Sequence, residues 1–226
     1  MQLEVTSAFP TFIGRLRVPD ADSMNRDLRA LILREEATQG TLGRSNIGGW
    51  HSRPDFLNHD DPSVAALTMW ITWAVSRIVD ETAGAGAFKG EVSLSAWATI
   101  CRAGAYHAPH SHPDSAWSGV YYVDAGACSI DRPLGGVLEF IDPRAGVEAV
   151  SSPGDPYGRP ERVVPEAGLL VVFPSWLYHW VHPYDGPTPR IAISFNAAVA
   201  MVAPTPSKSS SSDIGLGAAE ILCRTA

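Results

Sequence analysis

The chain has 226 residues, of which 45% are hydrophobic and 18% charged, and its formal net charge is −7. This length and hydrophobic content suit one large domain, because all-β barrels and sandwiches of this size often fold as single units. Phosphate binding needs clustered Lys and Arg, which do not occur here, so the composition argues against a nucleic-acid partner. No apolar run approaches the roughly 20 residues of a membrane helix, and the N-terminus does not resemble a secretory signal.

The cysteines carry information about the compartment. Cys101, Cys128 and Cys223 are widely spaced, odd in number and without a CxxC pair. This pattern argues against a disulfide framework and against structural zinc, and it favours a reducing environment. We therefore expect a cytoplasmic protein without a membrane partner; a homodimer stays open.

Two helices are expected in the first third of the chain. Residues 18–37 carry apolar side chains at helical spacing, and the N-cap candidates and the apolar positions are Asp20, Asp22 and Ser23, then Met24, Leu28, Leu31 and Ile32. A second helix should begin at Asp61-Pro62-Ser63, with Asp61 as N-cap and proline in the first turn. Its apolar stripe comprises Val64, Leu67, Trp70, Ile71, Ala74 and Ile78. Residues 3–8 look strand-like, and residues 38–62 look like a long loop.

From residue 91 onward the pattern changes to short strands separated by turns. Six runs rich in β-branched and aromatic residues alternate with Gly, Pro and Asp: EVSLSAWATICR, SGVYYV, GGVLEFI, GLLVVFP, HWVHP and RIAISFNAAV. Such regular spacing predicts a mainly-β protein, with an antiparallel sandwich or barrel flanked by the N-terminal helices. The Ser/Pro-rich composition after Ala203 predicts a flexible linker and tail over residues 203–226, so the domain should span 1–202.

Five of the seven histidines fall in two short clusters, HAPHSHPD and HWVH. Two imidazoles and one carboxylate on one face form a common non-haem metal site. Residues two apart in a strand point to the same side and lie about 6.6 Å apart, so a His-x-Asp pair can supply two ligands to one ion. His112 and Asp114 form such a pair, and His179 begins a later strand that could supply the third ligand.

A possible anion-binding residue follows the second cluster. Arg190 stands eleven residues beyond His179 and opens the run RIAISFN. Arg190 and Ser194 are four residues apart and should share one face of a strand. A guanidinium there can bind a carboxylate through two parallel hydrogen bonds, and Ser194 can add a third donor. This order is what a jelly-roll metalloenzyme with an anionic co-substrate should show.

Three segments of the sequence resemble a known group of enzymes: HSHPDSAWSGVYYV, GGVLEFIDPR and GLLVVFPSWLYHWVHPYDGPTPRIAISFN. They are similar to the 2-oxoglutarate/Fe(II) oxygenase superfamily, above all to a branch of small bacterial oxygenases, with prolyl-4-hydroxylase-like enzymes as more distant relatives. With RSNIGGWHS, the likeness spans about residues 44–196. It implies a double-stranded β-helix of the jelly-roll, cupin-like kind. It also implies Fe(II), 2-oxoglutarate and O₂, and hydroxylation of a small molecule, amino acid or peptide-like substrate with release of succinate and CO₂.

The resemblance also implies roles for individual residues. By motif position, His112, Asp114 and His179 are the iron ligands, and Arg190 binds the C5-carboxylate of 2-oxoglutarate. In this branch the position of Asp114 does not reliably hold an acid, so His110 is the alternative ligand, because it can share a face with His112.

The resemblance does not identify with the same clarity the residue whose hydroxyl assists Arg190 in binding 2-oxoglutarate. Many relatives place it at the position of Ala192, so Ser194 would have to replace it here. Tyr106 and Tyr121, and beside them Tyr122, are further candidates for a hydroxyl that contacts 2-oxoglutarate, although all three are first of all strand residues that pack in the core.

Other residues have simpler interpretations. His107 and His110 are expected in a polar loop, and His182 should point away from His179 and serve the structure. Gly135-Gly136 should form a turn with close packing rather than a phosphate-binding loop, because no helix follows it.

Two alternative functions remain. One is a cupin-like metal enzyme, an isomerase or a dioxygenase, that does not use 2-oxoglutarate and so needs no arginine at position 190. The other is a metal-free barrel that acts as a binding module.

Overall fold

The computed structural model describes residues 2–84, 86, 88, 90–127, 131–151, 153–154 and 160–201. Within these ranges the chain forms two antiparallel sheets, which confirms the mainly-β class. The larger sheet has the order β1 (Gly14–Arg17), β9 (Leu169–Pro174), β6 (Trp117–Asp124), β11 (Arg190–Met201), β4 (Gly90–Cys101) and β3 (Trp50–His51). The smaller sheet has the order β2 (Asn46–Ile47), β5 (Tyr106–His110), β10 (His179–Val181), β7 (Leu138–Phe140) and β8 (Glu161–Val163).

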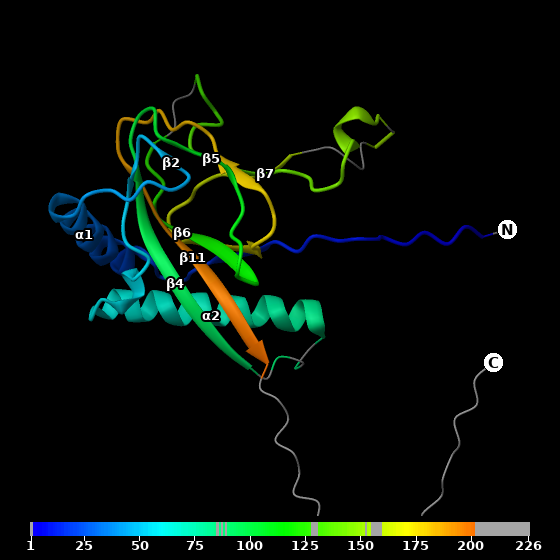
Figure 1. Ribbon diagram of the computed structural model, residues 1–226, viewed down its shortest axis with the longest axis horizontal. Helices are drawn as coiled ribbons and strands as arrows, with labels where there is room; N and C mark the ends of the chain where they lie inside the picture. The colour runs from blue at the N-terminus through cyan, green and yellow to red at the C-terminus, as the bar shows by residue number, and fades with distance from the viewer. Residues whose placement is uncertain are drawn as a thin grey trace, which may run out of the picture.

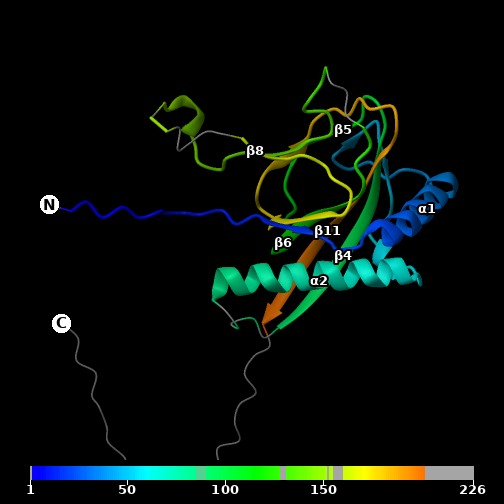
Figure 2. The same cartoon turned by 180° about the vertical axis from the view of Figure 1, so that it is seen from behind.

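Both predicted helices are present and cover the larger sheet. They are α1 (Asp22–Thr38) and α2 (Pro62–Ala83), and α2 lies across strands β4 and β11 in both views (Figures 1 and 2). The main core lies between these helices and the sheet, where Leu28, Leu67 and Ile71 pack with Ile193 and Phe195. Burial of such side chains stabilises each by about 1.5–3 kcal/mol. The helices therefore occupy one face of this sheet, and the opposite face is left for the smaller sheet and the site between them.

Helix α2 is long and apolar enough to cross a membrane by length and composition. The expectation that no apolar run approaches this length overlooked it, because threonine and serine interrupt the run. In the structure Val64, Leu67 and Ile71 are buried, and 44% of the apolar window lies inside the protein. Packing against the sheet therefore accounts for the apolar stripe.

The helix caps follow the prediction in one case only. The Asp61 carboxylate accepts a hydrogen bond from the backbone N–H of Ser63 at 2.8 Å, which confirms the N-cap of α2. For α1 the predicted polar caps were wrong, because Ala21 is the N-cap and no side chain caps the helix. Asp22 instead lies in the first turn, where a negative charge favours the helix dipole.

Several segments differ from the predicted pattern. Residues 3–8 are not a strand, and the first strand is β1; the chain before it runs away from the body (Figure 1). Residues 38–62 contain β2, β3 and a short 3-10 helix (Phe56–Asn58), with a second one at Val147–Ala149. Strands β5 and β8 were not predicted. The expected linker and tail over 203–226 lie outside the described residues.

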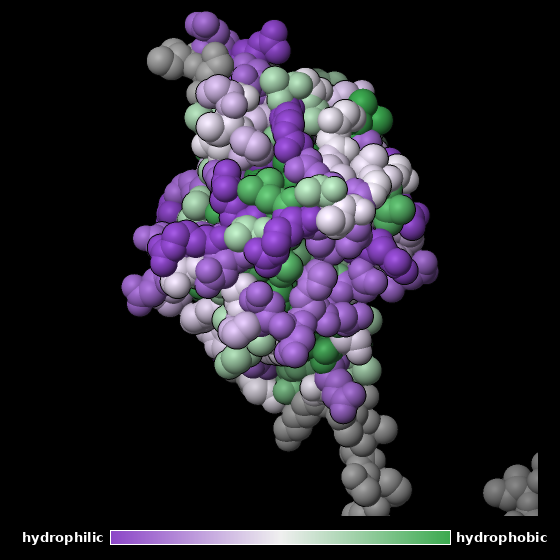
Figure 3. Space-filling view, turned by 90° about the vertical axis from the view of Figure 1, so that its left-hand side faces the viewer, coloured by the Kyte–Doolittle hydropathy of each residue, from purple (hydrophilic) through white to green (hydrophobic). Residues whose placement is uncertain are grey.

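The surface drawn in Figure 3 mixes polar and apolar residues. Hydrophobic colour occurs there as small separate patches among hydrophilic residues. Scattered apolar side chains of this kind are normal on a protein surface and indicate no broad interface on this face.

Candidate active site

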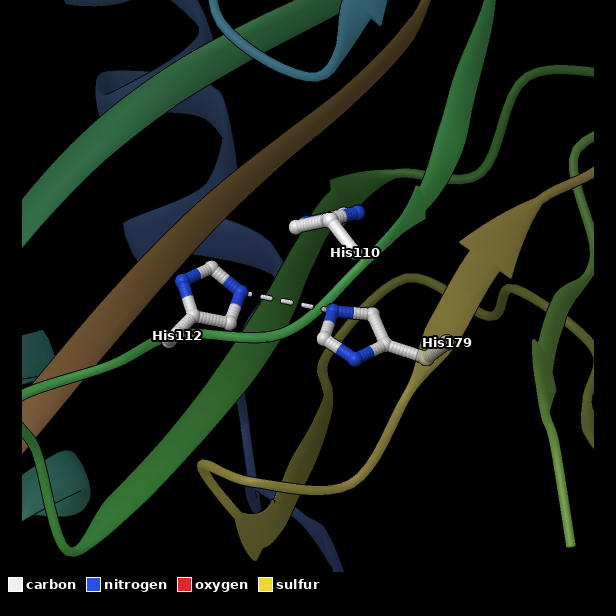
Figure 4. Close-up of side chains that lie close together, drawn as sticks. All are labelled: His110, His112 and His179. Carbon is white, nitrogen blue, oxygen red and sulfur yellow. Dashed lines mark hydrogen bonds between the residues drawn. The ribbon is translucent and has the colours of Figure 1, made fainter. Parts of the chain in front are cut away.

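A cluster of three histidines lies where β5 and β10 pair. His110 ends β5 and is the direct cross-strand partner of His179, which begins β10. His112 follows two residues after β5, and its backbone N–H donates to the carbonyl of Ser175 at 2.9 Å. One ring nitrogen from each of His110, His112 and His179 lies within 4.8 Å of the other two. Figure 4 shows the three rings facing a common point, with His112 Nε2 and His179 Nε2 only 3.3 Å apart.

Backbone carbonyls orient two of these rings. The Nδ1–H of His179 donates to the carbonyl of Leu177, and that of His110 donates to the carbonyl of Ala108, each at 2.8 Å. Both bonds fix the tautomer and leave Nε2 as an acceptor; in His110 this atom lies 3.3 Å from the hydroxyl of Ser45. This is how metal-binding histidines are usually held, with the second ring nitrogen tied to a carbonyl or carboxylate. Three unprotonated imidazole nitrogens that converge in this way form a donor set that suits Fe, Zn, Cu or Ni.

Burial keeps the histidines neutral. Burial, together with the neighbouring His110, lowers the pKa of His179 to about 3 and that of His112 to about 4. Burial also lowers the pKa of His110. Neutral imidazole is the form that coordinates a metal, so the cluster needs no proton loss near pH 7 to bind one.

The structure does not place Asp114 with the histidines. Asp114 is exposed, with a backbone φ of 69°, in the turn that leads into β6. The prediction assumed that strand geometry continues through Pro113, but β5 ends at His110. The pair with a spacing of two residues that faces His179 is therefore His110 and His112, the alternative that the sequence left open.

Aromatic side chains enclose the cluster. The ring of Phe173 lies edge-on to His179 at 4.7 Å between centroids, and Phe140 lies 6.1 Å from the same ring. On the other side, the Trp97 ring lies 5.7 Å from His112. These walls limit water around the histidines and leave the cluster open only toward a cavity.

The segment that carries His112 is tied to the larger sheet. Ser175, whose carbonyl accepts the His112 N–H, shares a hydroxyl hydrogen bond of 2.7 Å with Ser118. The Ser118 hydroxyl donates in turn to Asn196 Oδ1 at 2.8 Å. Ser118 and Ser175 are both buried, so the network joins β6, β9 and β11 to the loop that holds His112.

The cavity has a volume of about 470 Å³ and contains a buried arginine. Arg190 is only 2% exposed, its guanidinium lies over the Tyr122 ring at 5.0 Å, and its Nη1 is 4.0 Å from Cys101 Sγ. Arg190 Nε and Tyr122 Oη are both buried without a hydrogen-bond partner in the structure. Burying a charge in this way is costly unless a partner of opposite charge is supplied. The arrangement fits an anion that would accept from both groups.

Close packing holds the arginine in place. Gly136 has a positive φ of 73°, and a Cβ there would meet Arg190 Cδ at 3.0 Å. This confirms that Gly135-Gly136 serves a turn with close packing. The glycine lets the chain cover the stem of Arg190 without displacing it.

The structure distinguishes between the hydroxyl candidates that the sequence offers. Tyr121 points to the helix side, where its hydroxyl donates to Asn25 Oδ1 at 2.6 Å, so its predicted contact with 2-oxoglutarate is wrong. Its neighbour Tyr122 faces the cavity instead, because successive residues of β6 point to opposite faces. Ser194 lines the cavity together with Arg190, as predicted, whereas Tyr106 is not among the lining residues.

Two cavity residues were not predicted as site residues. His107 is buried in β5, and its Nε2 lies 3.7 Å from Cys101 Sγ. Burial and the nearby Arg190 lower its pKa to about 3. His51 is buried and stacks on Trp97, with ring centroids 5.6 Å apart. The clustering of histidines around position 110 was a signal for His107, and His51 lies in the segment RSNIGGWHS that resembles the oxygenase family.

The contacts of His182 agree with the structural role that the sequence predicts. Its Nε2 lies 3.1 Å from Glu139 Oε2, and Glu139 also pairs with Arg162. The pair lies on the side of β10 away from the histidine cluster, where it links β10, β7 and β8.

Comparisons with known proteins agree with this geometry. Residues 95–196 match the model of a family described as "Putative 2OG-Fe(II) oxygenase". The sequence matches none of the curated proteins with which it was compared.

Among solved structures, a Pseudomonas putida prolyl-4-hydroxylase is similar at 18% identity and TM-score 0.60, covering 83% of this chain and 92% of that one. HygX from Streptomyces hygroscopicus, solved with nickel and 2-oxoglutarate, is similar at 10% identity and TM-score 0.57, covering 83% of each chain. The α-ketoglutarate-dependent epimerase SnoN from nogalamycin biosynthesis is similar at 14% identity and TM-score 0.59, covering 90% of this chain and 85% of that one.

These likenesses show that the two sheets form the double-stranded β-helix that the sequence predicts. The matched family segment contains the entire histidine cluster and Arg190. Over residues 95–196 the chain is thus similar to the 2-oxoglutarate/Fe(II) oxygenases that the sequence resembles, and it has the fold of solved members of that group.

Proposed function

We propose that this protein is a hydroxylase in which His110, His112 and His179 bind Fe(II) and Arg190 anchors 2-oxoglutarate. The observation that carries the proposal is that one cavity contains both three neighbouring imidazole nitrogens and a buried guanidinium that has no carboxylate partner among the described residues. When bound, Fe(II) with 2-oxoglutarate and O₂ supplies the oxidising chemistry that inserts oxygen into a substrate C–H bond, with release of succinate and CO₂.

The protein side chains supply binding and exclusion of water. The three imidazoles would hold the metal at the end of the cavity. Arg190 would bind the distal carboxylate of the co-substrate through its guanidinium, and the Tyr122 hydroxyl could add a further donor. Each hydrogen bond to a charged group contributes about 1.5–3 kcal/mol, so these donors set the affinity for 2-oxoglutarate.

This assignment replaces Asp114 by His110 as the third ligand. The consequence is a site without a protein carboxylate, so Fe(II) keeps its full charge of +2 rather than +1. An anionic co-substrate would then balance the metal charge, which supports the role of 2-oxoglutarate as a ligand of this site.

The proposal is tested by anaerobic titration of the purified protein with Fe(II) and 2-oxoglutarate. Chelation of the metal by the co-substrate gives an absorption band in the visible range, and admission of O₂ should produce succinate. Absence of both the band and succinate from the wild-type protein, at saturating metal, would contradict the proposal.

A second function deserves a test because the donor set favours it. Three neutral histidines also suit a cupin-like dioxygenase or isomerase that acts on its substrate without 2-oxoglutarate. In that case replacement of Arg190 by Ala leaves activity intact, whereas the proposed function requires a loss. A protein that folds normally but binds no metal would instead indicate a binding module.

A further inference from the structure

The cavity that leads to the histidine cluster differs in charge from the rest of the protein. The chain has 24 acidic residues and a net charge of −7. None of the described residues that line the cavity is an Asp or a Glu, whereas two arginines, Arg44 and Arg190, are among them. A lining of this kind raises the local concentration of anions and excludes cations.

Arg190 is at the inner end and is assigned to 2-oxoglutarate, so Arg44 remains for another anion. Arg44 is exposed at the mouth and has no carboxylate within ion-pair distance among the described residues. Its charge is close enough to His51 to lower the pKa of that residue further, after burial. By contrast Arg53, which follows β3, pairs with Asp55 at 3.6 Å. Of these two arginines, the one that lines the cavity is thus the one without a carboxylate partner among the described residues.

Rings form one wall of the cavity beside Arg44. His51 and Trp97 stack with an interplanar angle of 10°, and Trp97 tilts toward His112 at 33°. Trp97 is only half-buried and lines the cavity, so part of the indole is accessible to a ligand there. A flat or apolar group that lies on this face would reach the histidine cluster.

The neighbouring strands supply neutral polar groups. Ser95 pairs with Asn196 in the register of β4 and β11, and Trp97 pairs with Ser194. All four residues line the cavity. They can accept or donate hydrogen bonds, but they carry no charge that would bind an amine or a phosphate.

We propose that the substrate is a carboxylate-bearing small molecule, with its carboxylate on Arg44, its apolar body on Trp97 and the C–H bond to be oxidised beside the histidine cluster. This inference rests on the proposed function and names the substrate class of the same site. A single guanidinium with no lysine beside it matches one negative charge, so a monoanionic carboxylate fits better than a phosphate dianion.

The test compares matched acids and amides. Binding of 3-phenylpropanoate and 3-phenylpropanamide, and of hexanoate and hexanamide, is measured calorimetrically on the full chain. The protein is loaded with Zn(II) in place of iron and with saturating 2-oxoglutarate, so that Arg190 is occupied and no turnover occurs. At least one acid should bind about 10-fold or more tightly than its amide, because a charge-assisted bond to Arg44 is lost in the amide.

Variants locate this preference. Arg44→Gln should abolish the difference between acid and amide, whereas Arg53→Gln, which removes an exposed arginine outside the cavity lining, should keep it. The melting temperature of Arg44→Gln should equal that of the wild type, since the side chain is exposed. Equal binding of acid and amide in the wild type, or a preference that survives in Arg44→Gln, overturns the inference.

The experiment distinguishes failure of this inference about the substrate from failure of the proposed function. If the metal-loaded protein does not bind 2-oxoglutarate, the proposed function fails, and the acid and amide pairs are then measured with the metal alone. If the wild type and Arg53→Gln then bind the acid more tightly than its amide and Arg44→Gln does not, the result would still support a carboxylate site at the mouth. Tighter binding of phenyl phosphate than of either acid would contradict the choice of a carboxylate.

Discussion

The guanidinium of Arg190 lies over the ring of Tyr122 at 5.0 Å, and each residue keeps one buried polar atom without a partner. The two residues come from adjacent strands, since Tyr122 pairs with Ala192 in the register of β6 and β11. A cation on an aromatic face is stabilised by about 0.5–2 kcal/mol, which does not by itself offset the burial of a charge. An anion that accepts hydrogen bonds from Arg190 and Tyr122 would offset this cost, so we expect the two residues to bind one.

Replacement of Arg190 by Gln should raise the Kd for 2-oxoglutarate by at least about 10-fold, because two charge-assisted hydrogen bonds are lost. Isothermal titration of the Zn(II)-loaded protein measures this. Metal affinity should change little, which distinguishes loss of the anion site from a general collapse of the cavity. An unchanged Kd for 2-oxoglutarate would assign Arg190 to another ligand.

Tyr122 and Tyr121 offer a matched pair of Tyr→Phe variants. Tyr122→Phe should weaken 2-oxoglutarate binding by about 10-fold without loss of stability, because its hydroxyl has no partner in the free protein. Tyr121→Phe should leave that binding unchanged and lower the free energy of unfolding by about 1 kcal/mol, because the bond to Asn25 is lost. Urea unfolding and 2-oxoglutarate titration of both variants check the contrast, and the reverse pattern would contradict the assignment.

The choice between His110 and Asp114 is open to a direct measurement. Loss of a partner outside the ligands costs about 10–100-fold in metal affinity, so His110→Ala should weaken Fe(II) or Zn(II) binding by about 100-fold or more. Asp114→Ala should retain wild-type affinity, because Asp114 is exposed and outside the cluster. Competition with a chromophoric chelator measures both. Strong loss in Asp114→Ala alone would restore the donor set of two histidines and one carboxylate.

The N-cap of α2 gives a stability prediction with a pH dependence. The hydrogen bonds from Ser63 lower the pKa of Asp61, so its contribution is fully present above its ordinary pKa of about 4 and is lost as pH falls through the lowered value. Asp61→Ala should lower the free energy of unfolding by about 1 kcal/mol at pH 7 and by less at pH 3. Asp61→Asn, which can still cap, serves as control. A difference between Asp61→Ala and the wild type that does not shrink at pH 3 would contradict this account.

Much of the fold could be predicted from local patterns. All six predicted strand runs contain observed strands, and both helices appear where apolar residues recur at helical spacing. Strand β5 could not be predicted in this way, because Pro109 and the two histidines of the strand, His107 and His110, conceal the alternation. The ligand assignment depended on that strand: once β5 is known to end at His110, the pair with His112 follows, and Asp114 falls in a turn.

The hydroxyl candidate could not be chosen from the sequence for a different reason. Six consecutive residues of β6, from Ser118 to Val123, are buried, so neither face of this strand shows a polar pattern. Both Tyr121 and Tyr122 are fully buried, one toward the helices and the other toward the cavity. Only the register with β11 shows which one lies beside Arg190, and register is set by contacts distant in sequence.

The serine network beneath His112 has a consequence for metal uptake. Because Ser175, Ser118 and Asn196 fasten this loop to three strands of the larger sheet, the entropy of ordering the ligand is lost when the chain folds and not when the ion arrives. The apoprotein is thus a preorganised chelator, and an ion that enters it meets its ligands already in position.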